Sequence, residues 1–172
     1  MESTQRSEAP VVATTSASAA ATVASPATIT VLMIDDAKTI VEYVRSALEQ
    51  TGGFRVVCAY DGEEGLERFY AERPDCVIVD IMMPRMDGYQ FVRCLRADAS
   101  ARQMPLIMAT ALATPSHEQI GYLSGADLYI TKPYRPNQLL DAIRRVMALT
   151  PEERERRMEI LAQGGEHPDA HL

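Results

Sequence analysis

The chain has 172 residues, the size of one ordinary domain, and 47% of them are hydrophobic, enough to bury a core. Its net charge of −7 argues against nucleic acid or an anionic membrane as a direct partner. No apolar stretch approaches the roughly 18 residues that a spanning helix needs. Composition therefore excludes collagen-like, disulfide-stapled and membrane-spanning proteins.

The three cysteines, Cys58, Cys76 and Cys94, have no C-x-x-C spacing, and each lies within or beside an apolar segment. This pattern predicts buried free thiols in a reducing compartment rather than a metal or redox site. The chain also begins without the basic start and dense apolar stretch of a signal peptide. We therefore expect a cytoplasmic protein with no membrane insertion.

Residues 1–27 are predicted to form a separate N-terminal tail. From Ala9 to Thr28 the chain carries no charge and consists mainly of Ala, Ser and Thr, with a proline near each end. A segment of this composition buries too little apolar surface to offset the entropy lost on ordering. We expect this tail to be disordered.

Strands and helices alternate between residues 28 and 150. In chain order, we predict a strand over 29–34, a helix over 37–51, a strand over 54–60, a helix carrying Leu66 and Phe69, a strand over 76–79, a helix around Val92, a strand over 105–109, a helix over 115–124, a strand over 128–131 and a helix over 136–149. This alternation predicts a doubly wound α/β fold, a five-stranded parallel sheet with five helices on its two faces. Uninterrupted apolar strands are typical of a sheet that is covered on both faces.

The segment 151–172 is predicted to be a short helical extension and tail rather than a domain. Thr150-Pro151-Glu152-Glu153 combines a capping box with proline at the first helical position, and Gly164-Gly165 ends the helix. Three apolar side chains could anchor this helix: Met158, Ile160 and Leu161. The sequence leaves open whether it is docked or solvated.

Acidic residues follow the first and third predicted strands. In an open parallel sheet, sites lie beyond the carboxyl ends of the strands where strand order reverses. With the order 2-1-3-4-5 that point lies between these two strands, where Asp35, Asp36 and Asp80 meet. Their mutual repulsion would be relieved by a hard cation, and a few oxygen ligands with room for water suit Mg²⁺. The alternative, in which Asp36 caps the next helix, explains neither the Asp-Asp doublet nor Asp80.

Two further polar residues follow strands at the same edge. Thr110 comes after the fourth strand, and Lys132, one of only two lysines, comes after the fifth. A compact ammonium suits an ion pair with a carboxylate or a contact with one phosphoryl oxygen. Together with Mg²⁺, these groups are the parts needed for phosphoryl transfer onto Asp80.

Four motifs at the strand ends resemble those of the receiver domain of a two-component response regulator. They are Val31-Leu-Met-Ile-Asp35-Asp36, Val79-Asp80-Ile-Met-Met-Pro84-Arg-Met-Asp87-Gly88, Ala109-Thr110-Ala111 and Gly125-Ala-Asp-Leu-Tyr129-Ile-Thr-Lys132-Pro133-Tyr134. The resemblance covers residues 28–149. It implies the flavodoxin-like receiver fold, and the motif details are also similar to single-domain regulators of chemotaxis or pili.

The resemblance implies a role for each acidic residue. Asp80 would be the phosphoacceptor. Asp36 and the backbone carbonyl of Met82 would bind Mg²⁺ directly, and Asp35 would act through water or as a second ligand. The side chain of Met82 is expected to pack, as is that of Met83.

The resemblance also implies a switch and a set of partners. Lys132 would contact the phosphoryl group and precede a cis peptide bond to Pro133, and Thr110 and Tyr129 resemble the switch pair. The donor would be a sensor histidine kinase or a phosphotransfer protein, and the output would be a protein target. The residues that resemble the family's docking surface are Thr39, Ile40 and Tyr43, together with Tyr134-Arg135-Pro136. No turnover of an external substrate is expected.

Two alternatives to a stand-alone regulator stay open. The chain could be the receiver fragment of a longer regulator, with residues 151–163 as a linker helix to a missing effector domain. It could also be a Mg²⁺-dependent phosphohydrolase that forms an aspartyl-phosphate. Such enzymes usually need a second acid just after the nucleophile, where Ile81 and Met82 stand.

The remaining expectations concern side chains around the motifs. Met82 and Leu112 resemble positions that gate hydrolysis of the phosphorylated form, and their apolar side chains predict slow hydrolysis. Asp87 is expected to cap the third helix. The three histidines have no metal-like spacing and are expected at the surface: His117, His167 and His171.

Overall fold

The computed structural model describes residues 28–111 and 114–163, which form five strands and six helices. The strands are β1 (Ile29–Ile34), β2 (Phe54–Ala59), β3 (Cys76–Val79), β4 (Leu106–Thr110) and β5 (Leu128–Thr131). The helices are α1 (Lys38–Gln50), α2 (Gly62–Glu72), α3 (Gly88–Ala97), α4 (Pro115–Leu123), α5 (Pro136–Ala148) and α6 (Pro151–Ala162). The predicted tail 1–27 lies outside the described residues.

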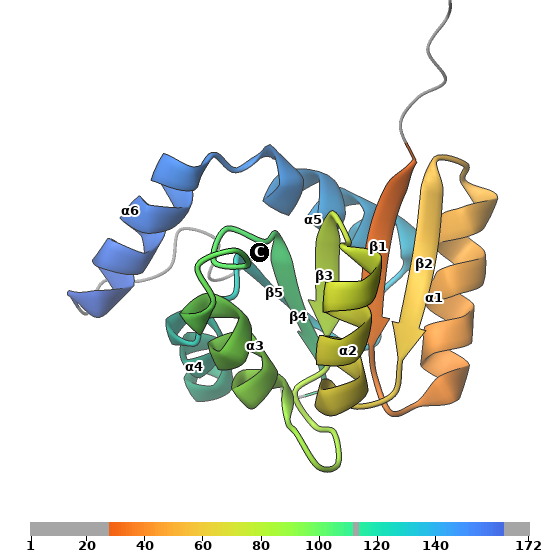
Figure 1. Ribbon diagram of the computed structural model, residues 1–172, viewed down its shortest axis with the longest axis horizontal. Coiled ribbons are helices and arrows are strands. Elements are labelled where there is room, and N and C mark those ends of the chain that lie inside the picture. Colours follow the sequence, from red (N-terminus) through yellow and green to blue (C-terminus); the bar gives the residue numbers. More distant parts are fainter. Residues whose placement is uncertain (1–27, 112–113, 164–172) are drawn as a thin grey trace, which may run out of the picture.

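All five strands run parallel in the order β2-β1-β3-β4-β5, so the predicted doubly wound sheet is confirmed. In Figure 1 the carboxyl ends of the strands point toward one edge of the molecule. The register pairs Ile34, the last residue of β1, with Val79, the last residue of β3. The segments that follow these two strands therefore leave the sheet side by side.

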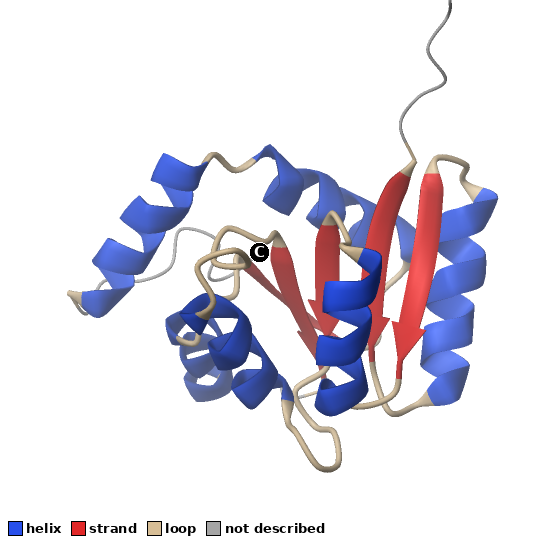
Figure 2. Cartoon of the chain, viewed as in Figure 1, coloured by secondary structure: helices blue, strands red, loops and turns tan. Residues whose placement is uncertain are grey.

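Helices cover both faces of the sheet, α2, α3 and α4 on one face and α1 and α5 on the other (Figure 2). Within β1, Leu32 and Ile34 pack into the core beneath the first group, whereas Val31 and Met33 pack into the core beneath the second. Because successive strand residues point to opposite faces, a sheet covered on both sides needs apolar residues at every position. This explains the uninterrupted apolar strands.

Side-chain capping differs among the helices. Asp61 accepts the backbone N–H groups of Glu63 and Glu64 at the start of α2. Asp87 forms a capping box at the start of α3, so its predicted role is confirmed. Helix α1 instead follows Ala37 with no side-chain cap, and the interpretation of Asp36 as a capping residue is wrong.

Helix α6 is a sixth helix beyond the five predicted for the domain, and it packs against α4. Leu161 is buried, as an anchor should be, but Met158 remains exposed. The main polar anchor is Arg154, which the apolar pattern did not reveal. Its side chain is 9% exposed, and its guanidinium donates to the Asp127 carboxylate at 2.9 Å and to the Leu149 carbonyl at 3.0 Å.

Asp127 is the buried centre of this docking contact. Arg96 approaches the same carboxylate at 3.4 Å, and the backbone N–H of Leu106 donates to it at 2.8 Å. Burial raises the pKa of Asp127, and the Arg96 and Arg154 guanidinium groups oppose that rise. One carboxylate therefore ties α6 to α3 and to the start of β4.

The cysteine prediction is only partly right. Cys76 is buried and Cys58 half-buried, but Cys94 is exposed. Its neighbours Val92 and Leu95 take the inward positions of α3, which leaves Cys94 on the outward side. All three are free thiols. Among the described helices, none is long and apolar enough to cross a membrane.

Replacing Arg154 with alanine should lower the free energy of unfolding by roughly 1–3 kcal/mol, because Asp127 loses one of its two cationic partners. Urea unfolding measures this. Arg156→Ala, at an exposed position of the same helix, is the matched control and should change stability little. Equal stability of the two variants would contradict a docking role for Arg154.

Candidate functional site

Three carboxylates meet at the carboxyl ends of β1 and β3. One oxygen from each of Asp35, Asp36 and Asp80 lies within 4.8 Å of the others. Asp35 is fully buried and Asp80 is 7% exposed, whereas Asp36 is exposed to solvent. The register of β1 and β3 brings these residues together, so the group predicted from the sequence is assembled and is open on the Asp36 side.

Lys132 lies against two of these carboxylates. Its Nζ forms ion pairs with Asp35 Oδ2 and with Asp80 Oδ2, the latter at 3.0 Å. Its backbone N–H donates to the Thr110 carbonyl at 2.8 Å, which continues the pairing of β4 with β5 beyond the strand ends. The Lys132 side chain is only 14% exposed, and its ammonium offsets one of the three negative charges.

The electrostatics of the group leave room for a cation. Burial raises the pKa of Asp35, while hydrogen bonds from Lys132 and from the Ala37 N–H oppose that rise. With all three carboxylates ionised, one ammonium leaves excess negative charge in a partly buried place. An oxygen-only donor set with one exposed member fits a hard divalent ion such as Mg²⁺, which keeps several waters.

The loop after Asp80 is tightly held where it leaves the site. Asp80 Oδ1 accepts the N–H of Ile81 at 2.7 Å, and the N–H of Gly88 donates to the Ile81 carbonyl at 3.0 Å. A Cβ at Gly88 would lie 2.2 Å from the Asp80 carbonyl oxygen, so only glycine fits there.

Met83 packs against the core as predicted. The prediction for Met82 is wrong, because its side chain is 60% exposed on the loop.

Thr110 and Tyr129 lie on neighbouring strands beside α4. Thr110, the last residue of β4, is fully buried, and Tyr129 on β5 is 7% exposed. A Cβ at Gly121 of α4 would lie 2.8 Å from the Tyr129 ring, so the helix backbone rests on that ring. Burial raises the pKa of Tyr129 and keeps its hydroxyl protonated. Of the two predicted switch residues, Tyr129 thus lies beneath a helix that contacts α6.

The chain after Lys132 ends the fourth motif with a tyrosine whose hydroxyl is buried. The Lys132–Pro133 peptide bond is cis. The next residue, Tyr134, packs against the core, and its buried hydroxyl has no hydrogen-bond partner among the described residues. The motif included Tyr134, but the sequence did not indicate that its hydroxyl would be buried without a partner.

Other predicted residues lie away from the cluster or outside the described chain. The expected surface position of His117 is only partly right, because the residue is half-buried and its carbonyl accepts the Tyr89 hydroxyl at 3.1 Å. Three residues lie outside the described ranges: Leu112, His167 and His171.

Millimolar Mg²⁺ should raise the melting temperature of the wild-type protein, because a cation bound only by the folded state relieves carboxylate repulsion there. Asp36→Ala should abolish this rise and leave the metal-free protein at least as stable as wild type. Asp141→Ala, which removes an exposed carboxylate on α5, should keep the full rise. A wild-type melting temperature unaffected by Mg²⁺ would contradict the metal site.

Replacing Tyr134 with phenylalanine should raise the free energy of unfolding by about 1 kcal/mol, because it removes a buried hydroxyl without a hydrogen-bond partner. Tyr43→Phe, at a side chain 53% exposed, should have almost no effect. Both are measured by urea unfolding. Lower stability of the Tyr134 variant would mean that the hydroxyl is satisfied in solution.

Comparison with known proteins adds a family match to this geometry. The family model of the response regulator receiver domain matches residues 31–144. The chain is 42% identical over 120 residues to a protein named "Probable transcriptional regulator ycf27" from Guillardia theta, with 70% of this chain and 46% of the relative covered. It is 36% identical to "Response regulator Rre1" from Synechocystis sp., with 70% and 52% covered. The chain spans about half the length of these curated relatives.

A solved structure has the same architecture over nearly its whole length. The chemotaxis protein CheY4 of Vibrio cholerae superposes with a TM-score of 0.66 at 34% identity, covering 70% of this chain and 99% of that protein. Residues 1–30 and 145–172 lie outside the family match.

Proposed function

The chain belongs to the response regulator receiver family, and we propose that Asp80 accepts a phosphoryl group within a two-component phosphorelay. The observation that carries the proposal is the Asp80 carboxylate itself. It is nearly buried, its Oδ2 lies 3.0 Å from Lys132 Nζ, and two further carboxylates lie beside it. Buried, paired carboxylates with a route to solvent are suited to nucleophilic chemistry.

Each residue of the site has a distinct task in this proposal. The N–H of Ile81 holds Asp80 Oδ1, which orients the carboxylate. An Asp80 oxygen attacks phosphorus, the bond from phosphorus to the donor's histidine nitrogen breaks, and the imidazole leaves. Lys132 already lies beside the attacking carboxylate and stabilises the charge on the transferred group. Mg²⁺, when held by Asp35, Asp36, Asp80 and the Met82 carbonyl, would supply further charge neutralisation.

The response to phosphorylation would pass through Thr110 and Tyr129. Thr110 ends β4 at the same edge as Asp80, and Tyr129 lies beneath Gly121 of α4. If the buried Thr110 hydroxyl and the Tyr129 ring changed their packing, the position of α4 on the sheet would change. The proposed output is therefore a changed surface around α4, recognised by a protein target rather than by nucleic acid.

The proposed donor is a sensor histidine kinase or a phosphotransfer protein in the cytoplasm. It must bring its phosphohistidine to the exposed side of the cluster, where α1 begins. Tyr43 on α1 is exposed, as a docking residue should be, whereas Ile40 is half-buried against the core. We assign docking to the Tyr43 side of α1 and to the loop after Lys132.

The proposal includes no turnover of an external substrate. An aspartyl-phosphate phosphohydrolase uses a second acid just after its nucleophile, and here those positions are Ile81, which is buried, and Met82, which is apolar. The exposed Met82 side chain is instead available to cover the phosphorylated Asp80.

The alternative to a stand-alone regulator is a longer regulator in which α6 is the linker, because this chain covers only about half the length of the curated relatives that it matches. A stop codon directly after Leu172 in the genomic reading frame would exclude that alternative.

Asp80→Asn should abolish phosphorylation by a small acyl phosphate in the presence of Mg²⁺ and leave the fold intact, because the amide has the same shape but is a poor nucleophile. A phosphate-affinity gel measures the labelled fraction. Asp141→Asn, at an exposed position of α5, is the control and should label like wild type. Labelling of the Asp80 variant at the wild-type rate would move the phosphoacceptor to Asp35 or Asp36.

A further inference from the structure

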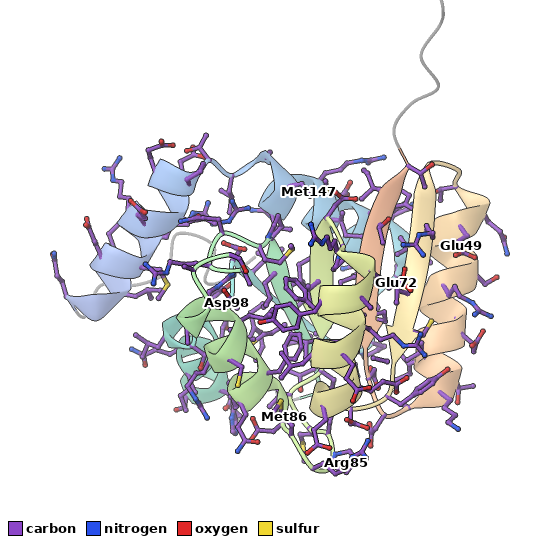
Figure 3. The ribbon with its side chains drawn as sticks, viewed as in Figure 1. Glu49, Glu72, Arg85, Met86, Asp98 and Met147 are labelled. Carbon is purple, nitrogen blue, oxygen red and sulfur yellow. The ribbon has the colours of Figure 1, made fainter. Side chains whose placement is uncertain are left out.

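The loop between β3 and α3 protrudes from the edge of the sheet that carries the acidic cluster (Figure 1), and Figure 3 shows Arg85 and Met86 on it. Its two ends meet where Gly88 donates to the Ile81 carbonyl. The loop therefore leaves the site and returns to it at one narrow neck. The proposed carbonyl ligand, Met82, lies one residue beyond that neck.

Arg85 has an unusual backbone conformation for its residue type. Its φ is +65°, the left-handed region that side chains other than glycine disfavour. Such a conformation persists only where surrounding contacts hold it. The guanidinium of Arg85 supplies such a contact: it forms an ion pair with Asp61 Oδ2, and its Nε lies 3.6 Å from Glu63 Oε2.

Asp61 connects this arginine to helix α2. Its carboxylate is buried, with a side chain 6% exposed. Oδ1 accepts the N–H groups of Glu63 and Glu64 at 2.9 and 3.0 Å, while Oδ2 faces Arg85. The cap of α2 and the anchor of the loop are thus two oxygens of one side chain, which has little freedom to move.

A second contact brings the loop to the same helix end. A Cβ at Gly62 would lie 2.6 Å from Met86 Cγ and 2.7 Å from the Met86 carbonyl oxygen. The backbone of the loop therefore packs on the first residue of α2, where only glycine leaves room. Arg85 and Met86 together attach the loop to α2, which is not part of the acidic cluster.

We propose that Arg85 is a positioning residue for the metal site, acting through its ion pair with Asp61 to hold the β3–α3 loop in the conformation that binds Mg²⁺. The inference rests on the proposed function, since it assigns a role toward the Mg²⁺ of that site. A free loop loses conformational entropy when a cation binds its backbone, and a loop held in advance loses less. Arg85 touches neither the cation nor the phosphoryl group.

The experiment measures Mg²⁺ affinity from the rise in melting temperature over a Mg²⁺ titration of the full chain. A second readout is the Mg²⁺ concentration that gives half-maximal labelling by a small acyl phosphate. Arg85→Ala should weaken Mg²⁺ binding by about two- to five-fold, the range for a partly exposed ion pair, and leave the labelling rate at saturating Mg²⁺ unchanged. Arg85→Lys, which keeps the cation, should restore most of the affinity.

Two further variants separate the ion pair from other effects. Arg85→Gly relieves the backbone conformation but removes the pair, so it should bind Mg²⁺ as weakly as Arg85→Ala. Asp61→Asn keeps an oxygen that can cap α2 but loses the charge. It should match Arg85→Ala, and adding Arg85→Ala to it should cause no further loss.

Arg55→Ala is the matched control. Arg55 is 49% exposed, against 59% for Arg85, and it pairs with Glu72 at the other end of α2. It should leave Mg²⁺ affinity at the wild-type value. Wild-type affinity in Arg85→Ala would overturn the inference, as would equal weakening in Arg55→Ala or additive losses in the double variant. Failure of the wild-type protein to bind Mg²⁺ at all would instead overturn the proposed metal site.

Discussion

The structure depends on placing three carboxylates together at one edge of a sheet and offsetting their repulsion. Lys132 does part of this, since its ammonium contacts both Asp35 and Asp80 while its backbone pairs with Thr110. One residue therefore joins the end of the fifth strand to the acidic residues that follow the first and third strands. The charge that it leaves unbalanced is what makes the site receptive to a cation and, in the proposed reaction, to a transferred group whose charge that cation shares.

Buried carboxylates recur as organising points elsewhere in the molecule. Asp61 caps α2 and holds Arg85, and Asp127 holds both Arg96 and Arg154. In each case one side chain joins segments that are distant in sequence. A buried carboxylate without partners is costly, so these contacts restrict which segments can pack there. The contact of Asp61 with Arg85 holds the β3–α3 loop beside the site. The contact of Asp127 with Arg154 holds α6 at the start of β5, whereas the site lies at the end of that strand.

Contacts elsewhere connect a predicted switch residue to the outer helices. Tyr129 lies beneath α4 at Gly121, where there is no space for a larger residue, and α4 in turn contacts α6. A close-packed interface of this kind responds to displacement by repacking rather than by gradual deformation. Helix α6, which the receiver-domain match does not include, is therefore in contact with the helix that rests on Tyr129.

The sequence by itself determined the parallel sheet, its five strands and the residues that follow them. Periodicity and apolar content are local properties, and the carboxyl ends of parallel strands always share one edge, so Asp35, Asp36, Asp80 and Lys132 could be assigned to one site. The sequence did not determine which side chains face outward. The burial predicted for Met82 and Cys94 was therefore wrong. Only the tertiary structure decided the pairing of Arg154 with Asp127 and of Arg85 with Asp61. An ion pair between residues far apart in the chain forms only when whole helices, strands and loops pack together. The polar pattern within one helix or loop does not indicate which distant residue completes the pair.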